Sequence, residues 1–312
     1  MSNGISIYFR LKNGTSVSCS KTVSVFFTKN RYLPYTSLNA SVICSLAAYD
    51  ILQVHCYIGN KLIHDGPCEY AVREIKNGRS VLTFRSRGYS AMLAQNEPVP
   101  GMNYNMDLTK LGRINTRIPN VTYESGTDEV NYIYVKERST IWDAVGAYAI
   151  KAYGTQPFIY GTNTVRVTKP AASHITVSAE KLISAGDSAD RRSILSTAYL
   201  ADLNGDYVYS LTSPTAEDLG IIRERYYPFD RQWADQPDEG LLQKLLVFGR
   251  RCASRFIRYI GYSGEDLFDV YTAQDPGSTL SGEVHEIEIK AEKGRIETTL
   301  RTFEEPEVAA AE

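Results

Sequence analysis

The stretch GEVHEIEIKAEKGRIETTLRTF (residues 282–303) decides the fold class, because apolar and polar residues alternate along both of its halves. Ile287 and Ile289 alternate with Glu286, Glu288 and Lys290 in the first half, and Ile296 and Leu300 stand on one face of the second half. A period of two is typical of a strand with one buried face. The stretch therefore predicts a β-hairpin that buries one side and carries charge on the other.

The loop of this hairpin determines whether its two apolar faces coincide. A two-residue loop at Lys293-Gly294, or a four-residue loop that begins at Ala291, places both apolar sets on one face. A three-residue loop would set Ile289 against Glu297, since a slip of one residue turns a strand over. The sequence favours the first two loops and leaves the choice between them open.

The composition indicates a globular protein with extensive hydrophobic cores. The chain has 312 residues, 43% of them hydrophobic, and a formal net charge of −2 at pH 7. This length is typical of about two domains, and the balanced charge argues against a polycation that binds nucleic acid. The N-terminal sequence has neither the basic start nor the apolar run of a signal peptide, and no apolar run reaches about 18 residues. We expect a soluble protein without a membrane anchor.

The patterns along the chain predict a mainly β fold with an α+β insert. Short alternating segments with turn signals between them occupy the first hundred residues and return in the last third, as in sandwiches and barrels. Between them, Ser139 or Thr140 is placed to cap a helix over 141–153 that ends at Gly154, followed by a small hairpin. We predict two antiparallel β-barrels and a helix-hairpin module, with these bounds: first barrel 1–108, α+β module 109–190, second barrel 191–304 with an inserted helix at about 238–258, flexible tail 305–312.

Motifs for catalysis or metal binding are missing from the sequence. It contains no GxSxG, GxxxxGK[ST] or HExxH motif. The four histidines fall on predicted strands or loops, where half-exposed strand residues are a better interpretation than catalytic bases. The DLNGDY segment at 202–207 does not fit a calcium loop, because Gly205 stands at its fourth position and Ser213 where a glutamate is needed. We predict no catalytic, cofactor-binding or metal-binding residues.

Five cysteines leave two interpretations, a zinc site or buried free thiols. There is no CxxC or HxxxH pair to hold a tetrahedral ion, and a spacing of 12 residues matches one strand plus a turn. The odd count also favours a reducing compartment during folding. We favour buried thiols for this set: Cys19, Cys44, Cys56, Cys68 and Cys252.

A cationic stripe is the clearest polar pattern. On the predicted helix, Lys244, Arg251, Arg255 and Arg258 fall at i, i+7, i+11 and i+14, which is one face. One interpretation is a solvated face with local salt bridges. The others are a contact to an acidic neighbouring subunit and a contact to passing nucleic acid.

The order of these patterns resembles the baseplate hub proteins of contractile phage tails. That family includes the late control D and phage Mu hub proteins, the hub half of type VI secretion spikes and tail proteins of defective Bacillus prophages. Residues 51–93 are similar to its strand, turn, strand and helix order, residues 139–167 to its helix-hairpin module, and residues 282–303 to its closing hairpin. The resemblance covers most of the chain as pattern and order, without a single diagnostic motif.

The resemblance implies a structural role. Hubs of this family are homotrimers in which six barrels form a ring that joins the sixfold tail tube to a threefold spike, and this part of the family bears no catalytic residues. By this resemblance the partners are the tail tube, spike, tape-measure and other baseplate proteins, DNA is only cargo in the lumen, and the protein belongs to a virion or tail-like particle assembled in the bacterial cytoplasm. The predicted subunit contacts are the cationic stripe and the charged hairpin face: Lys244, Arg251, Arg255, Arg258, Glu286, Glu288, Arg295 and Arg301.

Two rival functions remain. The same fold would serve as the tail-tip base of a non-contractile phage or as part of a phage-tail-like bacteriocin. A carbohydrate-binding or carbohydrate-degrading tail-tip protein would instead use grooves lined by aromatic residues, for which Trp142 and Trp233 are available.

Overall fold

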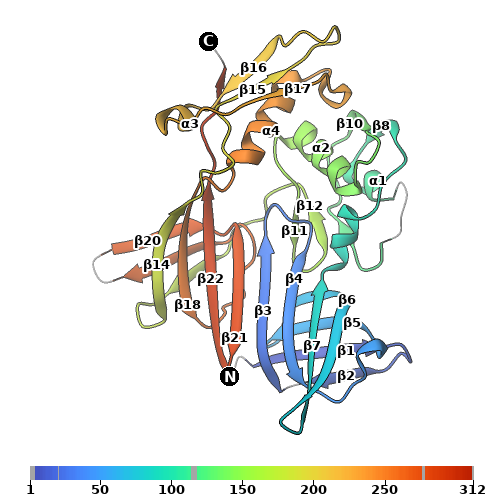
Figure 1. Cartoon of the computed structure of the whole chain (residues 1–312), viewed down its shortest axis with the longest axis vertical. Helices are drawn as coiled ribbons and strands as arrows, with labels where there is room; N and C mark the ends of the chain where they lie inside the picture. The colour runs from blue at the N-terminus through green and yellow to red at the C-terminus, as the bar shows by residue number, and fades with distance from the viewer. Residues whose placement is uncertain (1–3, 20, 114–117, 276–277, 311–312) are drawn as a thin grey trace.

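In the computed structural model, which describes residues 4–19, 21–113, 118–275 and 278–310, an 11-stranded sheet is the main element. Eight neighbouring strands form its long antiparallel part (Figure 1). In spatial order they are β14 (Leu182–Ala189), β18 (Ala253–Ile260), β22 (Arg295–Glu304), β21 (Glu286–Glu292), β3 (Thr22–Asn30), β4 (Thr36–Ile43), β7 (Arg79–Arg87) and β6 (Lys61–Lys76). The N-terminal and C-terminal thirds of the chain therefore share one sheet.

The sheet folds over along β6, which is long enough to belong to two layers. Its first half pairs with β5 (Ile51–Ile58) and its second half with β7. Gly66 lies at the fold, where a Cβ atom would come within 2.0 Å of the Arg87 carbonyl oxygen. Only glycine allows the two backbones to approach this closely. The second layer continues from β5 through β1 (Ile5–Leu11) to β2 (Ser16–Cys19). In the chain, the short η1 (Ala48–Asp50) comes directly before β5.

A separate three-stranded sheet covers β14, β18, β22 and β21. It consists of β13 (His174–Val177), β19 (Val270–Asp275) and β20 (Ser278–Glu283), with β13 parallel to β19. Both two-layered regions share one hydrophobic core, which extends from Phe9 and Phe84 to Tyr271 and Ile289. The long sheet is thus the common wall of two β-sandwiches.

The predicted helix-hairpin module is present between β7 and β13. The helix α2 (Ile141–Tyr153) ends at Gly154 with φ of 63°, as the sequence predicts, and it begins at Thr140, one of the two predicted caps, with a capping box to Asp143. The other elements of this first insert are η2 (Tyr89–Ala94), β8 (Gly101–Met106), α1 (Leu108–Arg113), β9 (Thr122–Tyr123), β10 (Val130–Val135), β11 (Phe158–Tyr160) and β12 (Thr164–Arg166).

A second insert lies between β14 and β18 and has a core of its own. Its centre is formed by Leu195, Leu200, Leu241 and Leu245. The insert lies above the long sheet, beside α2 (Figure 1). Its elements are β15 (Thr197–Leu200), β16 (Tyr209–Thr212), α3 (Pro214–Asp218), β17 (Glu224–Tyr227), η3 (Arg231–Trp233) and α4 (Pro237–Gly249), and β23 (Ala309–Ala310) pairs with β16.

The predicted helix at 238–258 is wrong in its second half. Helix α4 ends at Gly249, where a Cβ atom would come within 2.3 Å of the Pro306 ring, and residues 253–260 form β18. The segment ASRFIRYI also alternates with a period of two, and pairing with β14 and β22 overrides its helical spacing. The basic residues after α4 are therefore not on one helix.

Two predicted boundaries also need correction. Strands β13 and β14 pair with β19 and β18, so they belong with the second β region and not with a module that extends to residue 190. The expected flexible tail at 305–312 contains the short strand β23, and residues 311–312 lie outside the described residues. The mainly β fold class with an α+β insert is confirmed.

Candidate assembly surfaces

The long sheet contains the same four-stranded unit twice. The first unit is β3, β4, β7 and β6, and the second unit is β14, β18, β22 and β21. In this spatial order the strands of each unit are numbered one to four. In both units the chain visits strands one, two, four and three in that order, so strand four precedes strand three. The two units therefore repeat one topology.

Two local details confirm that the units are equivalent. Strands four and three are joined in both by a two-residue turn with left-handed backbone, at Asn77-Gly78 and at Lys293-Gly294, as in type I′ hairpins. Strand one carries an irregularity at the same place in both, between Thr22 and Ser24 and between Leu182 and Ser184. Of the two loops that the sequence leaves open for the closing hairpin, the structure has the two-residue loop at Lys293-Gly294.

The two units meet where strand four of the second pairs with strand one of the first. Seven residue pairs join β21 to β3, from Glu286 opposite Asn30 to Glu292 opposite Ser24. At the centre of this joint, Ile289 lies opposite Phe27, and both side chains are buried. The joint is antiparallel, as are all neighbouring strands within the units.

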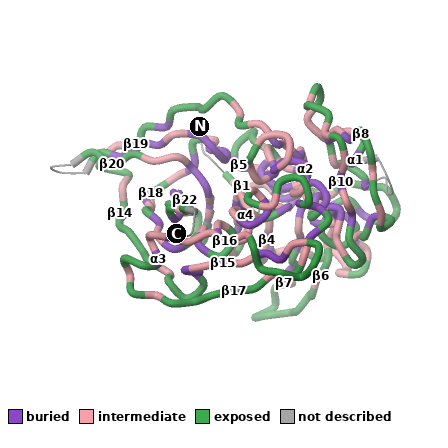
Figure 2. The backbone as a smooth tube through the Cα atoms, turned by 90° about the horizontal axis from the view of Figure 1, so that it is seen from above, coloured by how far each residue is buried: buried purple, intermediate pink, exposed green. Residues whose placement is uncertain are grey.

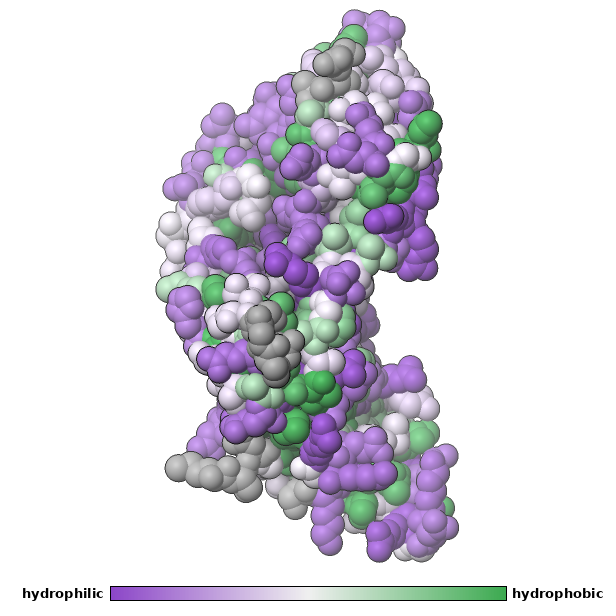
Figure 3. Space-filling view, turned by 90° about the vertical axis from the view of Figure 1, so that its left-hand side faces the viewer, coloured by the Kyte–Doolittle hydropathy of each residue, from purple (hydrophilic) through white to green (hydrophobic). Residues whose placement is uncertain are grey.

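The eight-stranded part ends in two edges. Strand β14 pairs only with β18, and the second half of β6 pairs only with β7, among the described strands. Residues 186–189 and 72–76 are exposed, and the two edges lie on opposite sides of the molecule (Figure 2). On the side that carries β14, the surface is mostly hydrophilic, with small separate hydrophobic areas (Figure 3). One edge is strand one of the second unit (β14), and the other edge is strand four of the first unit (β6). The internal joint is also formed by a strand four and a strand one.

The face of the long sheet opposite the core carries most of the predicted contact residues. We call it the polar face, and the register of the strands assigns to it Thr28, Asn39, Thr83, Arg85, Arg258, Glu286, Glu288, Lys290, Arg295, Glu297, Thr299 and Arg301. Two ion pairs lie on this face: Glu286 Oε1 lies 3.3 Å from Arg301 Nε, and Arg295 Nε lies 2.9 Å from Glu297 Oε1. Such partly exposed pairs stabilise the fold only weakly.

The remaining predicted contact residues are scattered. Arg251 follows α4, and its Nη2 lies 3.4 Å from Glu286 Oε2. Arg255 is on β18 but on the core side of the sheet, where its Nε lies 2.8 Å from Glu304 Oε1. Lys244 lies on α4, with its Nζ 3.8 Å from Asp230 Oδ2 and over the Tyr227 ring. The predicted cationic stripe does not exist as one surface.

A buried ion pair ties the two units to the first insert. Lys29 of β3 forms an ion pair with Asp266, and its Nζ also donates to the Gly161 carbonyl oxygen at 2.7 Å. Asp266 Oδ2 accepts from the Gly161 N–H at 3.0 Å. Burial lowers the pKa of Lys29, while the Asp266 carboxylate acts in the opposite sense. The ammonium group and the carboxylate therefore depend on each other for stability in the interior.

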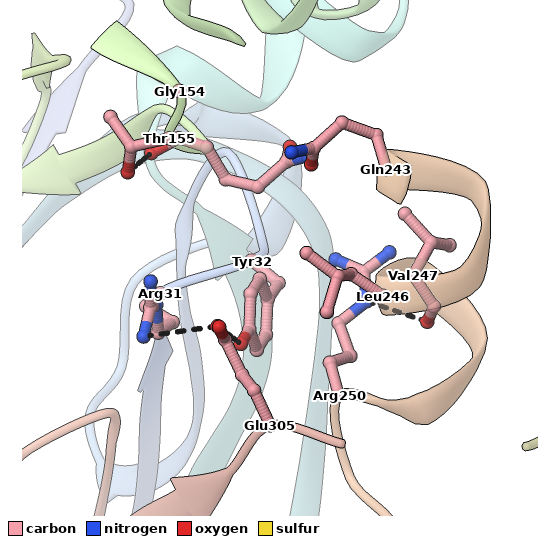
Figure 4. Close-up of a pocket in the computed structure, with 10 residues that line it drawn as sticks. Arg31, Tyr32, Gly154, Thr155, Gln243, Leu246, Val247, Arg250 and Glu305 are labelled. Carbon is pink, nitrogen blue, oxygen red and sulfur yellow. Dashed lines mark hydrogen bonds and ion pairs between the residues drawn. The ribbon is translucent and has the colours of Figure 1, made fainter. Parts of the chain in front are cut away.

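The inserts enclose a groove above the long sheet. A cavity of about 500 Å3 lies between α2, η3 and α4, and Trp142 and Trp233 both line it. The side-chain nitrogen of Gln232 in this wall is buried without a hydrogen-bond partner among the described residues. Next to it, Arg250 lies over the Tyr32 ring, and Tyr32 Oη donates to Glu305, which also pairs with Arg31 (Figure 4). The groove is polar with aromatic walls.

The described residues do not bring a set of potential metal ligands together. They contain no group of three or more His, Cys, Asp or Glu that could hold a metal ion. The five cysteines are free thiols, and the sulfurs of Cys19 and Cys44 lie 3.1 Å apart. Burial, together with the neighbouring Cys44, raises the pKa of Cys19 to about 12. None of the described helices is long and apolar enough to cross a membrane.

Two of the four histidines, His64 and His285, differ from the sequence-based interpretation as half-exposed strand residues. His64 is fully buried, with Thr36 Oγ1 at 2.8 Å from Nδ1 and Ser86 Oγ at 2.7 Å from Nε2. Burial lowers its pKa to about 3, so the ring is neutral at ordinary pH. His285 is also buried, which lowers its pKa as well. Both rings are structural hydrogen-bond partners inside the fold, and sequence periodicity gave no sign of this.

Two of the solved structures that share this fold are tail proteins. A tail protein of Neisseria meningitidis MC58 aligns over 96% of this chain and 97% of its own with a TM-score of 0.71 and 14% identity. The 43 kDa tail protein of prophage MuSo2 from Shewanella oneidensis aligns over 95% and 97% with a TM-score of 0.70 and 10% identity. The chain has the fold of phage tail proteins.

A similar arrangement occurs in a component of the type VI secretion system of E. coli, with a TM-score of 0.52, 8% identity and coverage of 94% of this chain and 74% of that one. No family model and no curated protein matches the sequence. At these identities the likeness concerns the fold, and the assembly surfaces must be argued from this chain's own strands.

Proposed function

We propose that the chain is the structural hub of a baseplate, in a phage tail or a contractile injection particle. Three copies form a ring of six four-stranded units that joins the tail tube to the central spike, and no reaction takes place in the protein. The observation that supports this proposal is the internal joint, in which strand four of one unit pairs with strand one of the next. The same kind of joint between copies would continue the sheet.

The strand directions are compatible with such a ring. Four antiparallel strands make the first and fourth strand of a unit run in opposite directions. Strand four of any unit is therefore antiparallel to strand one of the next when units are related by rotation. A closed ring also removes both exposed edges, which are otherwise templates for aggregation.

The orientation of the sheet supports a channel. The core face of the long sheet is covered by the β5–β1–β2 layer and by β13, β19 and β20, whereas the polar face has no second layer among the described strands. In the proposed ring the polar face lines the lumen, and DNA passes along it as cargo. Acidic residues such as Glu286 and Glu288 alternate with the cations of this face, so it is not a uniformly basic surface that would hold a polyanion.

The proposal includes partners and a location. The ring would contact the tail tube protein on one side and the spike on the other, with tape-measure and other baseplate proteins around them, in a particle assembled in the bacterial cytoplasm. The tail-tip base of a non-contractile phage or of a bacteriocin would use the same ring. Imaging of the particle in which the protein resides separates these cases by the presence of a sheath.

Light scattering after size exclusion, followed by negative-stain imaging, tests the hub. We expect three times the mass of the chain and a ring with a central channel. A protein that stays monomeric across the accessible concentration range, or that forms only closed dimers, would contradict the proposal.

The groove between the inserts favours one second candidate, carbohydrate binding. Trp142 and Trp233 line the same cavity, as a sugar-binding groove requires. A glycan array with the wild type and with Trp142→Ala tests it. Glycan binding that the substitution abolishes would support this candidate, and an array without signal would remove it.

A further inference from the structure

The duplicated unit provides a template for the contact between two copies. Superposing the two turns makes Lys76 of β6 equivalent to Glu292 of β21, because each is the last residue before a type I′ turn. By the same alignment Phe84 of β7 is equivalent to Leu300 of β22. Strand four of the first unit can therefore be compared residue by residue with strand four of the second.

The alignment extends across the sheet to strand one. Ala40 lies opposite Phe84, and Ile257 lies opposite Leu300, so these two residues are equivalent. Val25 lies opposite Ala40, and Ala185 lies opposite Ile257. Ala185 of β14 is thus equivalent to Val25 of β3, and the matching irregularities before them agree with this alignment.

The internal joint then specifies a register for the free edges. In it Ala291 lies opposite Val25, and Ile289 lies opposite Phe27. Carrying both pairs to the equivalent positions sets Ile75 opposite Ala185, and Arg73 opposite Asp187. We propose that β6 of one copy pairs with β14 of the next copy in this register, with an ion pair between Arg73 and Asp187 at its centre.

The chemistry of both edges fits this register. Arg73 and Asp187 are exposed and form no ion pair in the described chain; Arg73 Nη1 only donates to the Ser45 carbonyl oxygen at 3.0 Å. Beside Asp187 in the sheet is Arg255, which pairs with Glu304. The contact would add Arg73 to this row, so that charges alternate in sign from Arg73 through Asp187 and Arg255 to Glu304. Opposite charges directly across a strand pair are stabilising.

Other registers lose these pairs. A shift of two residues sets Arg73 against Ala185 or Ala189, and Asp187 against Ile75 or Ala71. A shift of one residue would turn one strand over. The register also places Ile75, which is 79% exposed, against the half-buried Ala185, so an isolated apolar side chain gains an apolar partner.

Cysteine cross-linking tests the register directly. This inference rests on the proposed ring, so the wild-type mass is measured first. Residues opposite each other in antiparallel strands have Cα atoms about 4.5–5.5 Å apart, within the range of a disulfide. We expect Ile75→Cys combined with Ala185→Cys to give chains linked between copies on a non-reducing gel. The control pairs Ile75→Cys with Ala189→Cys, four residues further along, and each single variant controls for the native cysteines.

Charge reversal tests the ion pair. We expect Arg73→Glu and Asp187→Arg each to raise the concentration at which half of the protein is assembled by about tenfold, because like charges then face each other. The double variant Arg73→Glu with Asp187→Arg should restore assembly. Arg79→Glu makes the same charge change at the end of the hairpin, away from the edge, and should leave assembly unchanged.

The outcomes separate the register from the ring. If the wild type forms a ring but only the Ile75–Ala189 pair cross-links, or if the double reversal fails to restore assembly, the register is wrong while the hub stands. If the wild type is a monomer at every concentration, the hub and this contact both fail. Cross-linking of the Ile75–Ala185 pair together with rescue by the double reversal would establish the contact.

Discussion

The hairpins β6–β7 and β21–β22 have the same topology and the same turn. The outer edge of β21 pairs with β3, whereas the second half of β6 has no strand on its outer edge among the described residues. In β21, Ile289 is fully buried against β3, whereas Arg73 occupies the equivalent position of β6 and is exposed. Next to them, Ala291 is 9% exposed and Ile75 is 79% exposed. Strand four therefore has buried apolar residues where another strand of the same chain pairs with it, and exposed residues where none does.

Strand one shows the same difference from the other side. Phe27 of β3 is buried in the internal joint, and Asp187 is exposed at the equivalent position of β14. A charged residue on an edge strand prevents random pairing with other sheets. A charge that meets its opposite in only one register prevents random pairing and still permits a specific contact.

The largest expected effect is at the internal joint. Ile289→Asp buries a carboxylate opposite Phe27, and we expect it to lower the free energy of unfolding by about 4 kcal/mol or more. The matched variant Arg73→Asp, at the equivalent exposed position, should stay within about 0.5 kcal/mol of the wild type. Urea unfolding of dilute protein, followed by circular dichroism, measures both. Equal losses for the two variants would show that the positions are not covered differently.

The buried Lys29 should have the next largest effect, since its equivalent in the second unit is Ala189. Lys29→Ala leaves Asp266 buried without its cation, and we expect a loss of about 3 kcal/mol in unfolding free energy. Combining Lys29→Met with Asp266→Asn should cost less than the sum of the two single variants. Additive costs in this cycle would mean that the pair has no coupling.

Acid should weaken the fold through His64, which only the first unit contains. Burial keeps the ring neutral down to a pKa of about 3, whereas the unfolded chain takes up a proton near the ordinary value of 6.5. The stability that His64 contributes is thus present above pH 6.5 and is lost as pH falls toward 3, by about 1.4 kcal/mol per pH unit. We expect His64→Gln to be less stable than the wild type at pH 7 and to lose less between pH 6.5 and 4.5. The unfolding free energy of both proteins is measured by urea unfolding at several pH values. If it falls equally with pH in the wild type and in His64→Gln, His64 does not have this role.

The sequence was sufficient where a local pattern decides the structure. The alternation around Ile287 and Ile289 and the stop at Gly154 each have one dominant physical cause, and the structure has the predicted hairpin and helix. For the cap the sequence left Ser139 and Thr140 open, and the structure uses Thr140. It misled after Gly249, where helical spacing and strand alternation coexist in one segment. There, pairing with strands far away in the sequence decides the outcome.

The assembly edges were the part that the sequence could not supply. Residues 182–189 are rich in small residues and lack a strong alternation, so the sequence does not indicate that β14 belongs to the second β region. An edge is defined by the absence of a neighbour, which depends on the whole topology. Once the topology is known, Arg73 and Asp187 are recognisable because residues equivalent to them are buried in the other unit.

The smallest expected effect tests whether the two hairpins are truly equivalent. Gly78 and Gly294 have φ of 70° and 81°, and an added Cβ atom would meet nothing within 4 Å at either position. The cost of Gly78→Ala and of Gly294→Ala should then come from the left-handed backbone alone, about 1 kcal/mol each in unfolding free energy. Asparagine tolerates this conformation, so Gly78→Asn and Gly294→Asn should cost less than the alanine variants. If one alanine variant is several times more costly than the other, the two turns do not share one geometry, and the residue alignment that sets Arg73 opposite Asp187 loses its starting point.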